Sequence, residues 1–168
     1  MRYKIFTLFA ALTLSAGALF ASDTAVDGIY YDFDATNLTA TVTYRGSNSG
    51  SYADEYTGNV VIPATVTYGS NTYSVTSIGD YAFESCTALH EITALPTVPP
   101  TCGDNAFYNV PTDITLRCPC ESREAYQAAD TWSQFTNIIP ADFPNVTLLA
   151  DEEQGSVQVE DRICGSNP

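Results

Sequence analysis

The phrase Gly-Asp-x-Ala-Phe occurs twice in this chain, as Ile78-Gly79-Asp80-Tyr81-Ala82-Phe83 and as Cys102-Gly103-Asp104-Asn105-Ala106-Phe107. The two phenylalanines are 24 residues apart. A repeat with a period in the low twenties is typical of solenoids, in which each unit stacks on a neighbour because it cannot bury its apolar face alone. We expect each Ala-Phe pair to lie on one short helical turn. The phrases therefore predict two successive coils that share a continuous interior.

A short run with β-strand character follows each phrase, at 90–95 and at 114–118. Aligning the units on their phenylalanines matches Ile92 with Leu116 and Ala94 with Cys118, and alternation along a strand points these side chains inward. The residues between them then point outward and form a candidate ligand-facing row: Glu91, Thr93, Thr115 and Arg117. Aligning the units on Pro96 and Pro119 instead gives a period of 23 and shifts the register by one residue.

The region before the repeats is predicted to be β. Two pairs of alternating runs flank links that are rich in turn-forming residues, so each pair predicts a hairpin. A further strand lies between the hairpins and stops at Pro63, which cannot donate to a strand ladder. The expected strands are 28–33, 38–44, 59–62, 65–68 and 72–75.

The region after the repeats is predicted to close the stack. Good helix formers with acidic residues in the first turn predict a helix at 121–129, and a last strand at 135–139 ends at Pro140. Four apolar residues are expected to cover the open end: Tyr126, Ala129, Trp132 and Phe135. The fold class is therefore α+β but mostly β, a short leucine-rich-repeat solenoid with N-terminal β-hairpins and a C-terminal capping helix.

The N-terminus has the features of a signal peptide at 1–21. A basic start precedes an apolar run at 5–15, and Ala16-Gly17-Ala18 or Ala21 supplies the small residues of a cleavage site. The apolar run is short for a membrane span, although an uncleaved anchor remains the alternative. We expect a secreted or cell-surface protein with no membrane span after signal removal.

The remaining chain is predicted to have three parts. An N-terminal β-hairpin cap occupies 22–74, and the leucine-rich repeats with their capping unit occupy 75–139. The segment 140–168 is strand-like and is interpreted as either a truncated second domain or a tail that leans on the first.

The charge of the chain excludes some partners. Six basic residues face 20 acidic ones, for a formal net charge of −14, and no lysine follows the signal peptide. Binding to nucleic acid or anionic lipid needs clustered cations, so neither is predicted. The carboxylates lack the spacing of a calcium loop, and no metal or other cofactor is predicted.

The five cysteines are an odd number, which leaves at least one thiol unpaired or paired between chains. Cys86 is interpreted as a small buried hydrophobe. A bridge between Cys118 and Cys120 would be badly strained, because only Pro119 separates them. A disulfide from either of them to Cys102 is an open alternative.

Catalytic chemistry is not predicted, and the chain is expected not to be an enzyme. His90 is the single histidine, and no third group is evident that would orient it against Cys86. Paired carboxylates for glycoside hydrolysis stay open, because such pairs meet only in space. Tyrosine suits recognition of proteins and sugars, and Tyr52 and Tyr56 in the polar loop 45–58 are the ones predicted to contact a partner.

The string from Val75 to Leu89 resembles the repeat of BspA-type leucine-rich-repeat surface proteins of host-associated anaerobic bacteria. The segment from Pro99 to Ile138 is similar to the closing unit of that family, including Cys118-Pro119-Cys120. The chain departs from the family in having only about two full repeats. The resemblance implies a non-catalytic, adhesin-like recognition module that binds a host protein, a glycan or a neighbouring cell. The alternative is a structural spacer module or a fragment of a larger surface protein.

Overall fold

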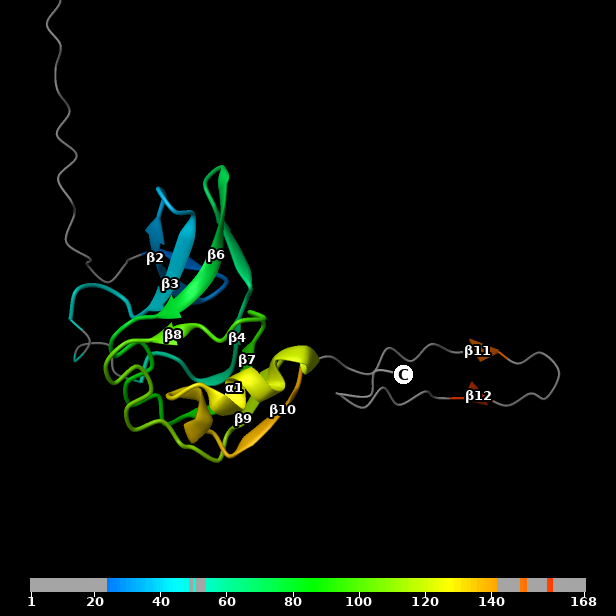
Figure 1. The fold of residues 1–168 in the computed structure, drawn as a ribbon. Helices are drawn as coiled ribbons and strands as arrows, with labels where there is room; N and C mark the ends of the chain where they lie inside the picture. Colours follow the sequence, from blue (N-terminus) through cyan, green and yellow to red (C-terminus); the bar gives the residue numbers. More distant parts are fainter. Residues whose placement is uncertain (1–23, 49, 51–53, 142–148, 151–156, 159–168) are drawn as a thin grey trace, which may run out of the picture.

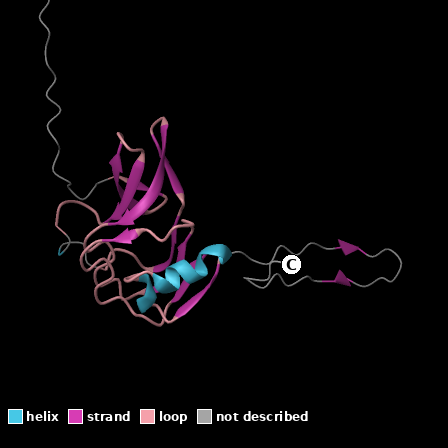
Figure 2. Cartoon of the chain, viewed as in Figure 1, coloured by secondary structure: helices cyan, strands magenta, loops and turns pink. Residues whose placement is uncertain are grey.

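The computed structural model describes residues 24–48, 50, 54–141, 149–150 and 157–158. The predicted signal peptide and most of the predicted tail lie outside the described residues. The described chain is mostly β, with one short α-helix beside the last strand of its main body (Figure 2). None of the helices in these ranges is long and apolar enough to cross a membrane.

Sheet A joins the two predicted hairpins (Figure 1). Its strands lie in the order β1-β2-β3-β6-β5, and β8 pairs with β6 beside this path. Each hairpin is antiparallel, whereas β3 and β6 meet in parallel. The hairpin predictions are confirmed, and β6 runs on to Ile78 because both β3 and β8 pair with it there. The strands are β1 (Ala25–Val26), β2 (Ile29–Asp34), β3 (Thr39–Thr43), β5 (Thr65–Tyr68), β6 (Asn71–Ile78) and β8 (Thr101–Cys102).

Sheet B contains the strands of the repeat region. The order β10-β9-β7-β4 follows the chain in reverse, and every neighbouring pair is parallel. Each strand is parallel to the one before it in the chain, so the chain must return to the same end of the sheet after every strand. This is the path of a coil. The strands are β4 (Gly58–Ile62), β7 (Leu89–Ala94), β9 (Thr115–Cys118) and β10 (Asn137–Pro140).

The register of sheet B settles the repeat period. Ile92 pairs with Leu116, which is the alignment on Phe83 and Phe107, so the period of 24 is confirmed and the alternative of 23 is wrong. The side chains of Ile92, Ala94, Leu116 and Cys118 are fully buried, as alternation along the strands predicts.

The Ala-Phe turns are not helical, which corrects the prediction. The first turn (79–86) has left-handed backbone at Tyr81 (φ 57°) and Ser85 (φ 57°). The second turn (103–110) repeats it at Asn105 (φ 53°) and Asn109 (φ 58°). Positive φ interrupts a right-handed helix, and asparagine accepts it more readily than most residues do. The two turns therefore share one irregular conformation.

The turns stack through their backbones. Three N–H groups of the first turn donate to carbonyls of the second, namely Tyr81 to Asp104 (3.0 Å), Phe83 to Ala106 (2.8 Å) and Ser85 to Tyr108 (2.8 Å). In the other direction, the Asp104 N–H donates to Asp80 Oδ1 at 2.8 Å. This ladder satisfies backbone groups that turns usually expose to water.

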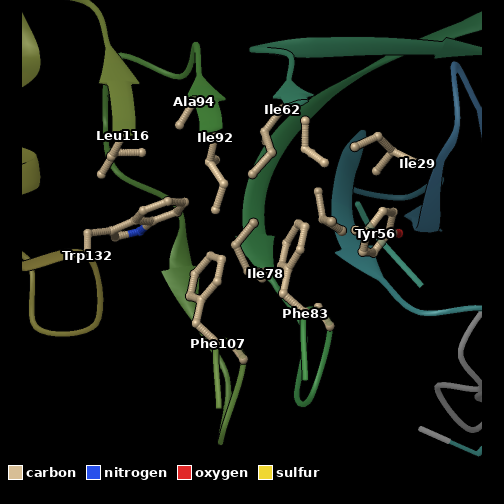
Figure 3. Close-up of a cluster of buried hydrophobic side chains, with 14 of the residues drawn as sticks. Ile29, Tyr56, Ile62, Ile78, Phe83, Ile92, Ala94, Phe107, Leu116 and Trp132 are labelled. Carbon is tan, nitrogen blue, oxygen red and sulfur yellow. The ribbon is translucent and has the colours of Figure 1, made fainter. Parts of the chain in front are cut away.

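An aromatic column runs through the hydrophobic core of the described residues (Figure 3). The rings of Phe83 and Phe107 stack with centroids 5.0 Å apart and planes 12° apart. Tyr56 lies 4.7 Å from Phe83 on one side, and Trp132 lies 5.1 Å from Phe107 on the other. Aliphatic side chains of sheet B face this column in the same view. The predicted common interior of the two units is therefore observed.

The cap is built from short helical segments: η2 (Cys120–Ser122), α1 (Arg123–Ala128) and η3 (Trp132–Gln134). The predicted helix thus starts as a 3₁₀ turn, and it ends at Ala128 because Ala129 is extended (ψ 128°). Tyr126 and Trp132 are buried, and their polar hydrogens donate to the carbonyls of Pro96 (2.9 Å) and Pro100 (2.8 Å). With Phe135 buried and Ala129 partly buried, these residues cover the end of the core as predicted.

Two further short strands, β11 (Leu149–Ala150) and β12 (Val157–Gln158), pair antiparallel with each other. They form a two-stranded sheet, separate from sheets A and B.

The cysteines correct one prediction. Cys86 and Cys102 are free thiols, whereas Cys120 is disulfide-bonded. Neither Cys118 nor Cys120 therefore pairs with Cys102. Cys86 is buried as expected, and its Sγ accepts a hydrogen bond from the Tyr56 N–H at 3.4 Å.

Candidate functional site

The outward residues of sheet B form an ordered polar surface. Glu91 lies opposite Thr115 and Thr93 lies opposite Arg117, and all four side chains are half-buried rather than buried. Their outward placement is as predicted, while ligand contact by any of them stays a prediction.

The surface is wider than the four predicted residues. Strand pairing extends it to β4 on one side and to β10 on the other, which gives two rows across four strands. One row is Asn59, Glu91, Thr115 and Asn137, and the other is Val61, Thr93, Arg117 and Ile139. We call these eight residues the outer face of sheet B. The same alternation that predicts an inward Ile92 also predicts outward side chains for the outer-face residues of β4 and β10, when it is applied to the strands at 59–62 and 135–139.

An ion pair holds the middle of the outer face. Arg117 Nε lies 2.7 Å from Glu91 Oε2, and Arg117 Nη1 donates to the Pro140 carbonyl at 3.4 Å. Both side chains are less than a third exposed, at 30% and 23%. Their charges offset each other, so the pair orders this surface without giving it net charge.

The Glu91–Arg117 pair is expected to contribute to stability in a salt-dependent way. A double-mutant cycle with Glu91→Gln and Arg117→Gln should give a coupling free energy of about 0.5–1 kcal/mol at low salt, because both partners are partly desolvated. The coupling should shrink in 1 M salt, where exposed charges are screened. Urea unfolding of the four proteins measures it. The same cycle on Arg45 and Glu55, 3.5 Å apart with Arg45 48% exposed, is the control and should give less; equal couplings would contradict the burial argument.

Tyr56 is a core residue rather than an exposed loop residue, which corrects the placement on which its predicted ligand contact rested. It is buried, its hydroxyl donates to the Thr43 carbonyl at 2.5 Å, and the same oxygen accepts the Tyr30 N–H at 3.1 Å. The surrounding polar loop suggested exposure, but the chain re-enters the core at this one position. Tyr52 lies outside the described residues, so its predicted role stays a prediction.

The described residues contain few groups suited to chemistry. His90 is exposed on β7 and does not face Cys86, which is buried. No cluster of three or more His, Cys, Asp or Glu side chains able to hold a metal ion occurs within the described ranges.

A groove of about 870 Å³ lies beside sheet B, and no pattern in the sequence predicts it. It is lined by the β1–β2 turn, by the segment leading into β4, by β4 itself and by β5. Residues far apart in the chain meet there, so no local pattern could have shown it.

Buried tyrosines make the fold sensitive to alkali. Burial, and secondarily the charge of Asp27, raises the pKa of Tyr31 to about 12. Burial also raises the pKa of Tyr56 and Tyr126. The folded chain therefore keeps protons that the unfolded chain loses above pH about 10. The stability that these tyrosines contribute is fully present below that pH and is lost as the pH rises toward 12.

Urea unfolding at pH 8, 10 and 11 should show this loss directly. Tyr31→Phe should flatten the decline, because it removes one of the titrating hydroxyls, whereas the exposed Tyr108→Phe should leave it unchanged. A wild-type stability that stays constant from pH 8 to 11 would contradict the prediction.

Neither a protein-family model nor a curated protein matches this chain. Among solved structures, the chain is similar to a leucine rich cell surface protein from Faecalibacterium prausnitzii A2-165, at 27% sequence identity and a TM-score of 0.38. The alignment covers 62% of this chain and 24% of that one. A TM-score this low does not establish a shared overall fold, and the chain spans about a quarter of that protein's length.

Proposed function

We propose that the chain is a secreted or cell-surface recognition module of the BspA-type leucine-rich-repeat class. It is non-catalytic and adhesin-like, and it binds an extracellular protein, a glycan or a neighbouring cell through the outer face of sheet B. The observation that carries the proposal is the continuous register of four parallel strands, which arranges eight outward side chains in two rows.

Rigidity supports a binding role for this surface. The residues between the outward ones, such as Ile92 and Leu116, are fully buried, so the core fixes each strand from behind. The Glu91–Arg117 ion pair and the hydrogen bond from Asn137 Nδ2 to Thr115 Oγ1 (3.0 Å) restrain the side chains in front. A partner that meets an already ordered surface loses less conformational entropy on binding.

Binding assays on the mature chain (22–168) test the proposal. The panel comprises extracellular matrix proteins, a glycan array and whole bacterial cells. Thr93 is the central position to alter, because Val61 and Arg117 flank it on either side. Thr93→Lys should weaken binding by at least about tenfold, since a long charged side chain then stands where the partner must make close contact.

Thr112→Lys is the matched control, because Thr112 is exposed outside sheet B. It should leave binding unchanged, and circular dichroism should show that both variants fold. Failure to bind anything on the panel, or equal effects of the two variants, would refute the proposed function.

The alternative function is a structural spacer, or a part of a larger surface protein. The β11–β12 pair favours it, because two strands alone do not make a stable fold in water. A further domain encoded beyond residue 168, together with an outer face that binds nothing, would support this alternative.

A further inference from the structure

The groove beside sheet B adjoins the free edge of β4. In the described part of the chain, β4 is the last strand of sheet B and pairs only with β7. The Gly58 N–H donates to the Ala88 carbonyl, and the Ile62 carbonyl accepts from the Leu95 N–H. The even-numbered residues of β4 therefore direct their backbone groups toward β7 and the segments next to it. The backbone groups of Asn59 and Val61 therefore point toward the open edge, since neighbouring residues in a strand alternate. Both residues line the groove.

One part of the groove wall is apolar. Tyr31, Val60 and Val66 line it and are almost fully buried, which leaves only their outermost atoms in contact with solvent. Alternation along β2 and β5 places Phe33 and Tyr68 on the same face of sheet A as Tyr31 and Val66. Those two rings stack 4.8 Å apart, with Tyr68 48% exposed. An apolar strip thus continues past the groove along sheet A.

The charges of the groove are negative. Asp27, on the exposed β1–β2 turn, and Glu55 both line it, and no Lys, Arg or His does. Arg45 approaches Glu55 from outside the lining, with Nε 3.5 Å from Oε1. The whole chain carries a formal net charge of −14, so its field attracts cationic groups.

We propose that this groove binds an extended peptide segment of a partner protein, rich in Lys or Arg, which adds as a strand to the free edge of β4. The inference rests on the proposed recognition function and names a second site, which shares Asn59 and Val61 with the outer face of sheet B, and its partner class. The backbone of Asn59 and Val61 supplies the ladder hydrogen bonds, and the apolar wall takes alternate side chains of the peptide. Asp27 attracts its cations, whereas the charge of Glu55 is offset by Arg45. A glycan has no backbone ladder to offer this edge, so the peptide fits the groove better.

Displayed linear ten-residue random peptides, selected on the mature chain (22–168), test the proposal. Enriched peptides should carry Lys or Arg beside alternating apolar residues. On binding they should slow hydrogen exchange of the Asn59 and Val61 amides, measured by NMR. Methylating alternate backbone nitrogens of such a peptide should abolish binding when the methylated edge faces β4, and should leave it within about threefold when the other edge is methylated.

Asp27→Asn should weaken a lysine-bearing peptide by about fivefold at low salt. It suits the test because asparagine tolerates the positive φ of 51° at this position. The exposed Asp113→Asn is the control and should have no effect. Thr93→Lys on the outer face of sheet B should also leave peptide binding intact, so this inference and the proposed function can fail separately.

Several results would overturn the inference. They are no enrichment over background, enriched peptides that map to another surface, or binding that tolerates methylation on either edge. Protection of the Asn59 and Val61 amides without peptide, rising with protein concentration, would show that a second copy of the chain occupies the edge instead. Protection that is independent of both peptide and protein concentration would assign the edge to the chain's own N- or C-terminal segment.

Discussion

Phe107→Ala is expected to lower the free energy of unfolding by about 3–5 kcal/mol, the range for truncating a buried phenylalanine. Phe107 has ring contacts on both sides within the aromatic column. Its ring stacks on Phe83 and contacts Trp132 at 5.1 Å and Phe135 at 5.3 Å, so one truncation removes contacts to both the other repeat and the cap. Small domains have about 5–15 kcal/mol of stability in total, so the loss is a large share.

Chemical denaturation of the mature chain measures this loss. Tyr108→Ala is the matched control, because Tyr108 is the next residue and is 60% exposed. It should change stability by no more than about 0.5 kcal/mol. If the two variants lowered the free energy of unfolding by similar small amounts, Phe83 and Phe107 would not share one core. The description of the two units as stacked would then fail.

Gly103→Ala is expected to destabilise the fold by about 1–3 kcal/mol, the usual cost of forcing extra atoms into a packed site. A Cβ at this position would lie 2.1 Å from Asp80 Oδ1, 2.7 Å from the Asp80 nitrogen and 3.0 Å from the Gly79 carbonyl carbon. The side chain of Asp80 can move, but the two backbone atoms belong to the stacked first turn. The turns would therefore separate, and the ladder between them would weaken.

A second substitution separates these two sources of strain. Asp80→Ala removes the nearest atom and leaves the backbone contacts. Adding Gly103→Ala to the Asp80→Ala variant should therefore still lower the free energy of unfolding, but by less than Gly103→Ala lowers it in the wild-type chain. Gly50→Ala is the control, because its Cβ would meet Asn48 Oδ1 at an ordinary 3.5 Å. If Gly103→Ala had no effect on stability in the Asp80→Ala variant, the close approach of the two backbones would not require glycine here.

The sequence was sufficient for the features that depend on local periodicity. Alternation in 90–95 and 114–118 predicted which side chains of sheet B point inward. The spacing of Phe83 and Phe107 predicted the pairing of Ile92 with Leu116 as one of two possible registers, and the structure decides between them. The hairpins were also predictable, because turn-forming residues separate their strands. These signals are strong because one-residue shifts would expose the buried side chains.

Other features depend on contacts between distant residues and were not predictable. The polar neighbours of Tyr56 predict a surface residue, whereas its hydroxyl binds Thr43 and Tyr30, which belong to sheet A. The sequence also predicts helical Ala-Phe turns, which the structure does not have. Their shape is set by the ladder between the turns, which a single unit does not reveal. The groove likewise exists only where β4 meets sheet A.

The matching backbone of the two turns bears on how this architecture can change in length. The first turn donates three backbone N–H groups to carbonyls of the second, and Trp132 and Phe135 of the cap pack against Phe107 in the second turn. Another 24-residue unit could be inserted between them while both ends kept their closures. Each insertion would widen the outer face by one strand spacing, about 4.8 Å. Gene duplication would then enlarge the available surface in fixed increments, without a new core having to evolve.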